Sequence, residues 1–213
     1  MGIEITEPRV IVCEGEGDVA FFTHLIRKRD LPPFQVLPAE GKSGYGRVLT
    51  GLSAGTGFDR LSGILVVGDN DLNPPAAFHD IQEQIRAAGG YGIPNRPGEA
   101  VKSQGFPAVV VMMVPLQQRV GCLETLLTEA AYEITPDLKT CVDAYAACTH
   151  ADAWNEVQQS KMKLQCLISA LCRSDPQTAV RYAWNRKEDI IPLDRPCFDQ
   201  LADFLRGFDN LLL

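Results

Sequence analysis

Hydrophobic residues in the first half of the chain fall into short runs separated by longer amphipathic stretches. The short runs are rich in β-branched residues and predict strands at Arg9–Cys13, Phe34–Leu37, Ile64–Val67 and Ala108–Val114. Apolar residues at helical spacing predict helices over about 18–29, 47–52 and 74–88. Glycines and prolines crowd the stretch 89–105, which predicts a long loop before the last strand.

This alternation of strands and helices predicts an α/β fold with a mostly parallel central sheet flanked by helices, as in Rossmann-like proteins. From Gly121 onward the pattern is mainly helical, and the stretch 197–213 places its apolar residues on one helical face. The sequence contains no repeat, low-complexity tract or linker. We therefore expect a single domain over residues 1–213, with an α/β core over 8–130 and a helical extension, 131–213, packed on it.

The composition indicates a cytoplasmic protein that does not enter a membrane. No apolar run approaches the roughly 20 residues that a membrane helix needs, and no secretory h-region follows Met1. The cysteines are odd in number and scattered, without a C-x-x-C pair. This distribution favours reduced core residues over a disulfide framework or a zinc site.

The net charge of −7 limits how the chain can bind nucleic acid. An acidic surface repels phosphates at long range, so a phosphate substrate requires a local basic patch or bound cations that reverse the field. The sequence leaves the oligomeric state open.

Acidic residues follow the predicted strands at the edge where α/β sheets place their chemistry. Glu14 follows the first strand and Asp18 begins the next helix, while Asp69 and Asp71 follow the third strand. Glu124 lies beyond the last strand, and we expect it in the first turn of a helix. We expect these carboxylates to converge on one site.

Such a cluster requires compensation, because two unit charges about 4 Å apart repel by roughly 4 kcal/mol at an effective dielectric constant near 20. With oxygen ligands, and no His or Cys expected nearby, the site suits Mg²⁺ or Mn²⁺ better than zinc. These ions could turn a phosphate-repelling site into one that binds and polarises a phosphodiester.

The acidic motifs resemble those of the Toprim domain of topoisomerases, bacterial primases and OLD-family nucleases. The similar segments are V-I-V-C-E-G-E-G-D, which contains Glu14, and I-L-V-V-G-D-N-D, which ends at Asp71. The G-C-L-E segment at Gly121–Glu124 is similar to the G-x-L-E segment of the OLD-type branch and of small stand-alone Toprim-like proteins. The resemblance covers about residues 8–130.

The resemblance implies a role for each matching residue. Glu14 would be a metal ligand or general acid/base, Asp18, Asp69 and Asp71 would coordinate metal, and Glu124 would belong to a second metal site. OLD-type enzymes also use a lysine near the scissile phosphate. Lys161 and Lys163 are the candidates in this chain, and we favour Lys163. The resemblance thus implies a catalytic set of Glu14, Asp69, Asp71 and Lys163.

The implied function is a Mg²⁺- or Mn²⁺-dependent nuclease acting on DNA or RNA. The sequence has no P-loop motif, so the ATPase that accompanies the nuclease in full-length OLD proteins would be a separate partner. A non-catalytic Toprim-like module that binds nucleic acid or protein is one alternative. A small-molecule phosphatase is another, since Asp69-Asn70-Asp71 also fits the D-x-D motif that haloacid-dehalogenase-type phosphatases place on an early strand.

A dinucleotide site is a further reading of the first motif. Gly15–Ala20 fits G-x-G-x-x-A after a strand, with Glu40 at a distance suited to a ribose. The acidic residues within and beside this turn would repel a pyrophosphate, which argues against dinucleotide binding.

Overall fold

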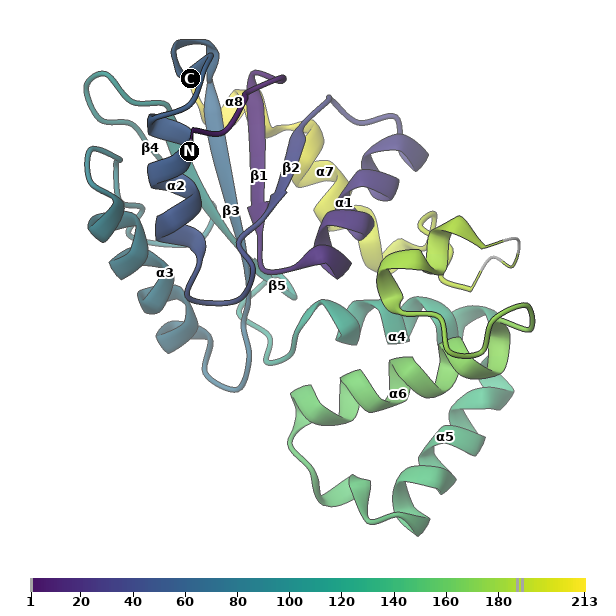
Figure 1. Ribbon diagram of the computed structural model, residues 1–213. Coiled ribbons are helices and arrows are strands. Elements are labelled where there is room, and N and C mark those ends of the chain that lie inside the picture. The colour runs from purple at the N-terminus through teal and green to yellow at the C-terminus, as the bar shows by residue number, and fades with distance from the viewer. Residues whose placement is uncertain (1, 187, 189) are drawn as a thin grey trace.

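A five-stranded sheet forms the centre of the computed structural model, which describes residues 2–186, 188 and 190–213 (Figure 1). The strands lie in the order β2-β1-β3-β5-β4. Four strands are parallel: β1 (Arg9–Cys13), β2 (Gln35–Pro38), β3 (Gly63–Asp69) and β5 (Ala108–Val114). The two-residue strand β4 (Ala100–Val101) pairs antiparallel with β5 at one edge.

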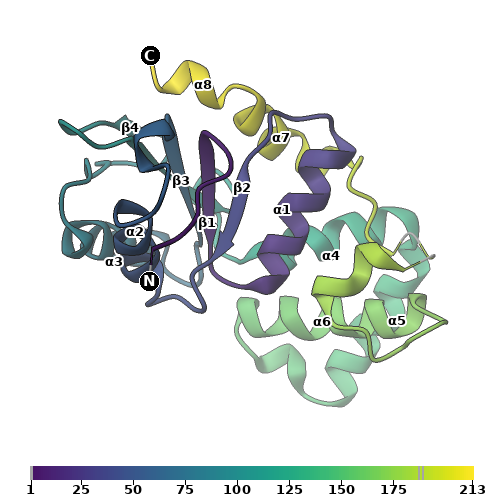
Figure 2. The same ribbon diagram turned by 45° about the horizontal axis from the view of Figure 1, so that its top comes forward.

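Helices cover both faces of this sheet (Figures 1 and 2). Helices α2 (Tyr45–Ser53) and α3 (Pro74–Ala88) pack on one face, where Val10 and Val12 of β1 point. The other face, with Ile11 and Cys13 of the same strand, is covered by α1 (Glu16–Lys28) and the C-terminal helices. Because both faces are buried, the central strands are apolar at nearly every position.

The remaining helices follow β5. They are α4 (Leu123–Ile134), α5 (Pro136–Cys148), α6 (Glu156–Leu171), α7 (Asp199–Arg206) and α8 (Phe208–Leu211). Short 3₁₀ helices connect elements at Phe58–Arg60 (η1), Ala151–Ala153 (η2), Val180–Asn185 (η3) and Pro196–Phe198 (η4). Helices α4, α5 and α6 form a group beside the carboxyl ends of the strands (Figure 1). None of the described helices is both long and apolar enough to cross a bilayer.

The fold class expected from the sequence is confirmed: a mostly parallel α/β sheet flanked by helices, with a mainly helical C-terminal portion. The main difference lies in the stretch 89–105, which contains β4 in addition to the expected loop. The glycines and prolines of this stretch gave no sign of a strand, because β4 forms only by pairing with the edge of β5. One apolar core includes residues of the sheet and of the C-terminal helices, such as Val110, Leu164 and Phe208.

Candidate functional site

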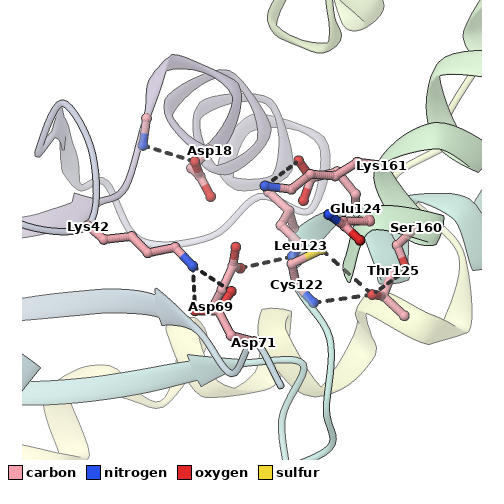
Figure 3. A network of polar contacts seen from close by, with 12 residues as sticks. Asp18, Lys42, Asp69, Asp71, Cys122, Leu123, Glu124, Thr125, Ser160 and Lys161 are labelled. Carbon is pink, nitrogen blue, oxygen red and sulfur yellow. Dashed lines mark hydrogen bonds and ion pairs between the residues drawn. The ribbon is translucent and has the colours of Figure 1, made fainter. Parts of the chain in front are cut away.

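Asp69 connects the sheet to the helical part of the chain. It ends β3, and its Oδ1 accepts a hydrogen bond of 2.9 Å from the backbone N–H of Leu123 at the start of α4 (Figure 3). Burial raises the pKa of Asp69 well above its usual range, and the negative charges of Asp18, Glu124 and Glu14 raise it further. Because neighbouring carboxylates repel one another, a cation bound between them would stabilise this arrangement.

Cys122 and Glu124 lie beside Asp69. Ligand atoms of the three side chains are all within 4.8 Å of one another. Cys122 is fully buried at the start of α4, where its backbone N–H donates to Thr125 Oγ1 at 3.2 Å. Burial raises the pKa of the Cys122 thiol, and the charges of Glu124 and Asp69 add to the effect. The sequence-based assumption that no cysteine lies near the acidic site is therefore wrong.

Asp18 and Glu14 approach the same cluster from the β1–α1 connection. Asp18 Oδ2 accepts a hydrogen bond of 3.0 Å from the N–H of Gly15, which fixes the first turn of α1. Burial raises the pKa of Asp18 to about 6, and the negative charges of Glu124 and Glu14 contribute to this rise. The hydrogen bond from Gly15 acts in the opposite direction and lowers the pKa. Burial also raises the pKa of Glu14, although the ammonium groups of Lys42 and Lys161 oppose this shift.

Asp71 is paired with Lys42 at the edge of the cluster. The Lys42 ammonium donates to both carboxylate oxygens of Asp71 (Figure 3). The loop that carries Lys42 is held on both sides: Gly41 N–H donates to Glu14 O at 2.9 Å, and Gln84 Nε2 donates to Lys42 O at 2.7 Å. Burial lowers the pKa of Lys42, because it disfavours the charged ammonium. The carboxylates of Asp71, Glu14 and Asp69 have the larger combined effect, so the pKa is raised.

The two candidate lysines of α6 point in different directions. Lys161 Nζ lies 3.9 Å from Glu124 Oε1, at the cluster (Figure 3). Lys163 Nζ lies 3.2 Å from Asp143 Oδ1 on α5, so the structure places Lys161, and not the favoured Lys163, at the cluster. Residues two apart on a helix face opposite sides, and the sequence did not show which side of α6 meets the sheet.

Asn70 is a structural part of the site that the sequence analysis did not identify. It is fully buried between Asp69 and Asp71, and its side-chain amide donates to Pro115 O and, at 2.8 Å, to Arg119 O. The backbone of the next residue also joins this connection, since Gly121 N–H donates to Asp71 O at 2.9 Å. These bonds hold the β5–α4 connection against the end of β3. The D-N-D motif alone gave no signal for this role.

A comparison with family models places the chain in a known family. The model described as "Protein of unknown function (DUF3226)" matches residues 8–209. The chain belongs to this family. No curated protein and no solved structure matches it. The function of this DUF3226 chain must therefore be argued from its own site.

The five carboxylates predicted from the sequence lie close enough to affect one another's pKa values, and of these Asp69 and Glu124 lie within 4.8 Å of each other and of Cys122; the five are Glu14, Asp18, Asp69, Asp71 and Glu124. Two ammonium groups, those of Lys42 and Lys161, accompany them. Burial is the largest cause of the raised pKa values of Glu14, Asp18 and Asp69, and the neighbouring carboxylates raise them further. Carboxylate oxygens and one thiol form a donor set that fits a divalent cation.

Proposed function

We propose that this DUF3226 chain is a divalent-metal-dependent phosphodiester hydrolase that acts on DNA or RNA. The observation that carries the proposal is the convergence of carboxylates from three distant segments, with Lys161 beside Glu124. The resemblance of its acidic motifs to the Toprim domain supports the same function, because each motif residue lies in this cluster.

Asp69 and Glu124 would hold one divalent cation, with Cys122 within reach of the same position. Glu14, Asp18 and Asp71 would complete this site or hold a second ion. When bound, Mg²⁺ or Mn²⁺ would supply positive charge to the phosphate oxygens and to the leaving oxygen. A thiol is a soft ligand, so its presence favours Mn²⁺ over Mg²⁺.

The chain's own side chains would assist in two ways. Glu14 lies at the wall of a cavity beside the cluster, and if it does not hold an ion its carboxylate would accept a proton from the attacking water. Lys161 and Lys42 enter the cluster from opposite sides in Figure 3. Their ammonium groups would stabilise the charge that develops on the phosphate during hydrolysis.

The test is nicking of supercoiled plasmid in Mn²⁺ by the wild type, Asp69→Asn and a matched control, Asp59→Asn. Asp59 is exposed in η1, and it does not line the cavity beside the cluster. We expect the wild type and Asp59→Asn to nick the plasmid and Asp69→Asn to lose this activity. Equal nicking by all three proteins would contradict the proposal, because it would indicate a contaminating nuclease.

Two further measurements separate the alternatives. Calorimetric titration with Mn²⁺ identifies a non-catalytic module if the metal binds but no plasmid or small phosphodiester is cleaved. Turnover of 4-nitrophenyl phosphate without turnover of bis(4-nitrophenyl) phosphate identifies a small-molecule phosphatase. The absence of both metal binding and cleavage would overturn all metal-dependent functions.

A further inference from the structure

A cavity of about 370 Å³ adjoins the acidic cluster and extends beyond it. Glu14, Asp69, Asp71 and Lys42 form the side shared with the cluster. Helix α3 forms another wall with Ala77, Asp80, Ile81 and Gln84, at i, i+3, i+4 and i+7, together with Glu83. The helix therefore presents one continuous face to the space next to the metal site.

The walls of this cavity are held in place by hydrogen bonds. Tyr45 OH donates to Val67 O at 2.8 Å, so the ring forms a fixed apolar surface. Gln84 uses both ends of its side-chain amide: Nε2 donates to Lys42 O at 2.7 Å, and Oε1 accepts from Gly46 N–H at 3.4 Å. Because these groups are already bonded, the cavity is preformed and does not need to reorganise around a ligand.

Charge and polarity limit what the cavity can hold. Carboxylates of Glu14, Asp69 and Asp71 line the part shared with the cluster, and α3 adds those of Asp80 and Glu83; Lys42 is the one cation that lines the cavity among the described residues. Without a cation beside them, Asp80 and Glu83 would repel a phosphate group from the part of the cavity along α3. Ala77 and the small exposed parts of Ile81 and Tyr45 instead offer apolar contact to an uncharged group. Asp80 makes no ion pair with any residue that the structure describes, and its carboxylate can only accept hydrogen bonds.

We propose that this cavity binds a nucleobase of the substrate, next to the phosphate held at the acidic cluster. The ring would lie against Ala77 and Ile81, and an exocyclic amino group would donate to Asp80. The class of occupant rests on the proposed function. Binding of an unstacked base implies that the substrate is single-stranded or opened at this position, since a base within a duplex is paired and stacked on its neighbours.

The test measures binding and does not depend on cleavage. A dinucleotide with a non-cleavable methylene-phosphonate linkage is titrated calorimetrically in Mn²⁺, together with two analogues that each lack one base. We expect removal of one base to weaken wild-type binding by about tenfold. Ala77→Leu fills the cavity and should abolish this preference, whereas Ala76→Leu, at an exposed neighbouring position, should keep it.

A second variant tests the role of Asp80. The wild type should bind a dinucleotide with cytosine in the cavity position more tightly than one with thymine. Asp80→Asn replaces one acceptor oxygen with an NH₂ donor, so this variant should lose the difference in affinity between cytosine and thymine. The cavity proposal is overturned if neither base-free analogue binds more weakly than the intact dinucleotide, or if Ala77→Leu behaves like the wild type. Base-dependent binding without plasmid nicking would support the cavity and reject the nuclease.

Discussion

Asp69 Oδ1 accepts a hydrogen bond of 2.9 Å from the backbone N–H of Leu123, across 54 positions of sequence. This bond joins the end of β3 to the start of α4, so the acidic cluster is built where the sheet meets the helical part of the chain. The helix N-terminus favours the Asp69 anion, while burial and the neighbouring carboxylates oppose it. The site therefore combines a rigid framework with an unfavourable concentration of charge.

Removing one of these charges should stabilise the metal-free protein. Asn at position 69 can still accept the Leu123 hydrogen bond, but it does not repel Asp18, Glu124 or Glu14. We expect Asp69→Asn to raise the free energy of unfolding by about 1 kcal/mol in EDTA, seen as a higher Tm. The variant should also lose the stabilisation that Mn²⁺ gives the wild type. A lower Tm in EDTA would show that the carboxylate is structural.

The stability of the metal-free protein should also fall as the pH rises. The pKa of Asp18 is raised to about 6 in the folded state, so between its unfolded value and that pH the folded protein binds more protons. Stability is then greater at about pH 5 than at about pH 7.5, by an amount on the order of 1 kcal/mol from this group. Thermal melts in EDTA measure this difference. It should shrink in Asp18→Asn, and an unchanged difference would contradict the assignment.

Most of the sheet could be predicted from the sequence because its strands are buried on both faces. Runs such as Ala108–Val114 contain no polar residue, and this pattern identifies a central parallel strand without further context. The strand β4 could not be predicted in the same way. It is two residues long, and it exists because β5 offers it an edge for antiparallel pairing. Local sequence carries little information about such a contact.

The sequence predicts those residues of the candidate site that directly follow a strand. Glu14 and Asp69 follow strands whose carboxyl ends meet at one edge of the sheet, so their proximity follows from topology. Cys122, Lys161 and Asn70 depend instead on how the β5–α4 connection and α6 dock on that edge. A rotation of α6 by half a turn would exchange the two lysines, and the sequence does not determine that rotation.

The two lysines of α6 give a matched pair of variants. Lys161→Ala removes the ammonium beside Glu124, and we expect the phosphodiesterase kcat to fall by about a hundredfold. Lys163→Ala breaks only an ion pair with Asp143, so kcat should stay within about twofold and stability should fall by no more than about 1 kcal/mol. Steady-state kinetics on bis(4-nitrophenyl) phosphate measure both. A larger loss for Lys163→Ala would restore the sequence-based preference.

Asn70→Ala should lower the free energy of unfolding more than Asn73→Ala. Asn70→Ala leaves the carbonyls of Pro115 and Arg119 without a donor in a buried place, at a cost of about 1–3 kcal/mol. Asn73→Ala removes an exposed helix cap on Ala76, at about 1 kcal/mol. Urea unfolding compares the two variants. Because Asn70 anchors the β5–α4 connection, Asn70→Ala should also weaken Mn²⁺ binding, whereas Asn73→Ala should not. An unchanged Mn²⁺ affinity of Asn70→Ala would show that other contacts hold the connection.

The ion pair formed by Arg9 and Asp209 ties α8 to the start of β1. Arg9 Nε donates to Asp209 Oδ1 at 2.6 Å, and this hydrogen bond lowers the pKa of Asp209. A lowered folded-state pKa gives stability at neutral pH that is lost as the pH falls and the carboxylate protonates, opposite in sign to Asp18. Asp209→Asn should therefore lower the Tm at about pH 7, by the equivalent of up to about 1 kcal/mol, and lower it by less as the pH falls toward about 2.5. Asp203→Asn, which breaks only a local pair with Arg206, is the control. An equal deficit at both pH values would show that Asp209 acts through packing and not through its charge.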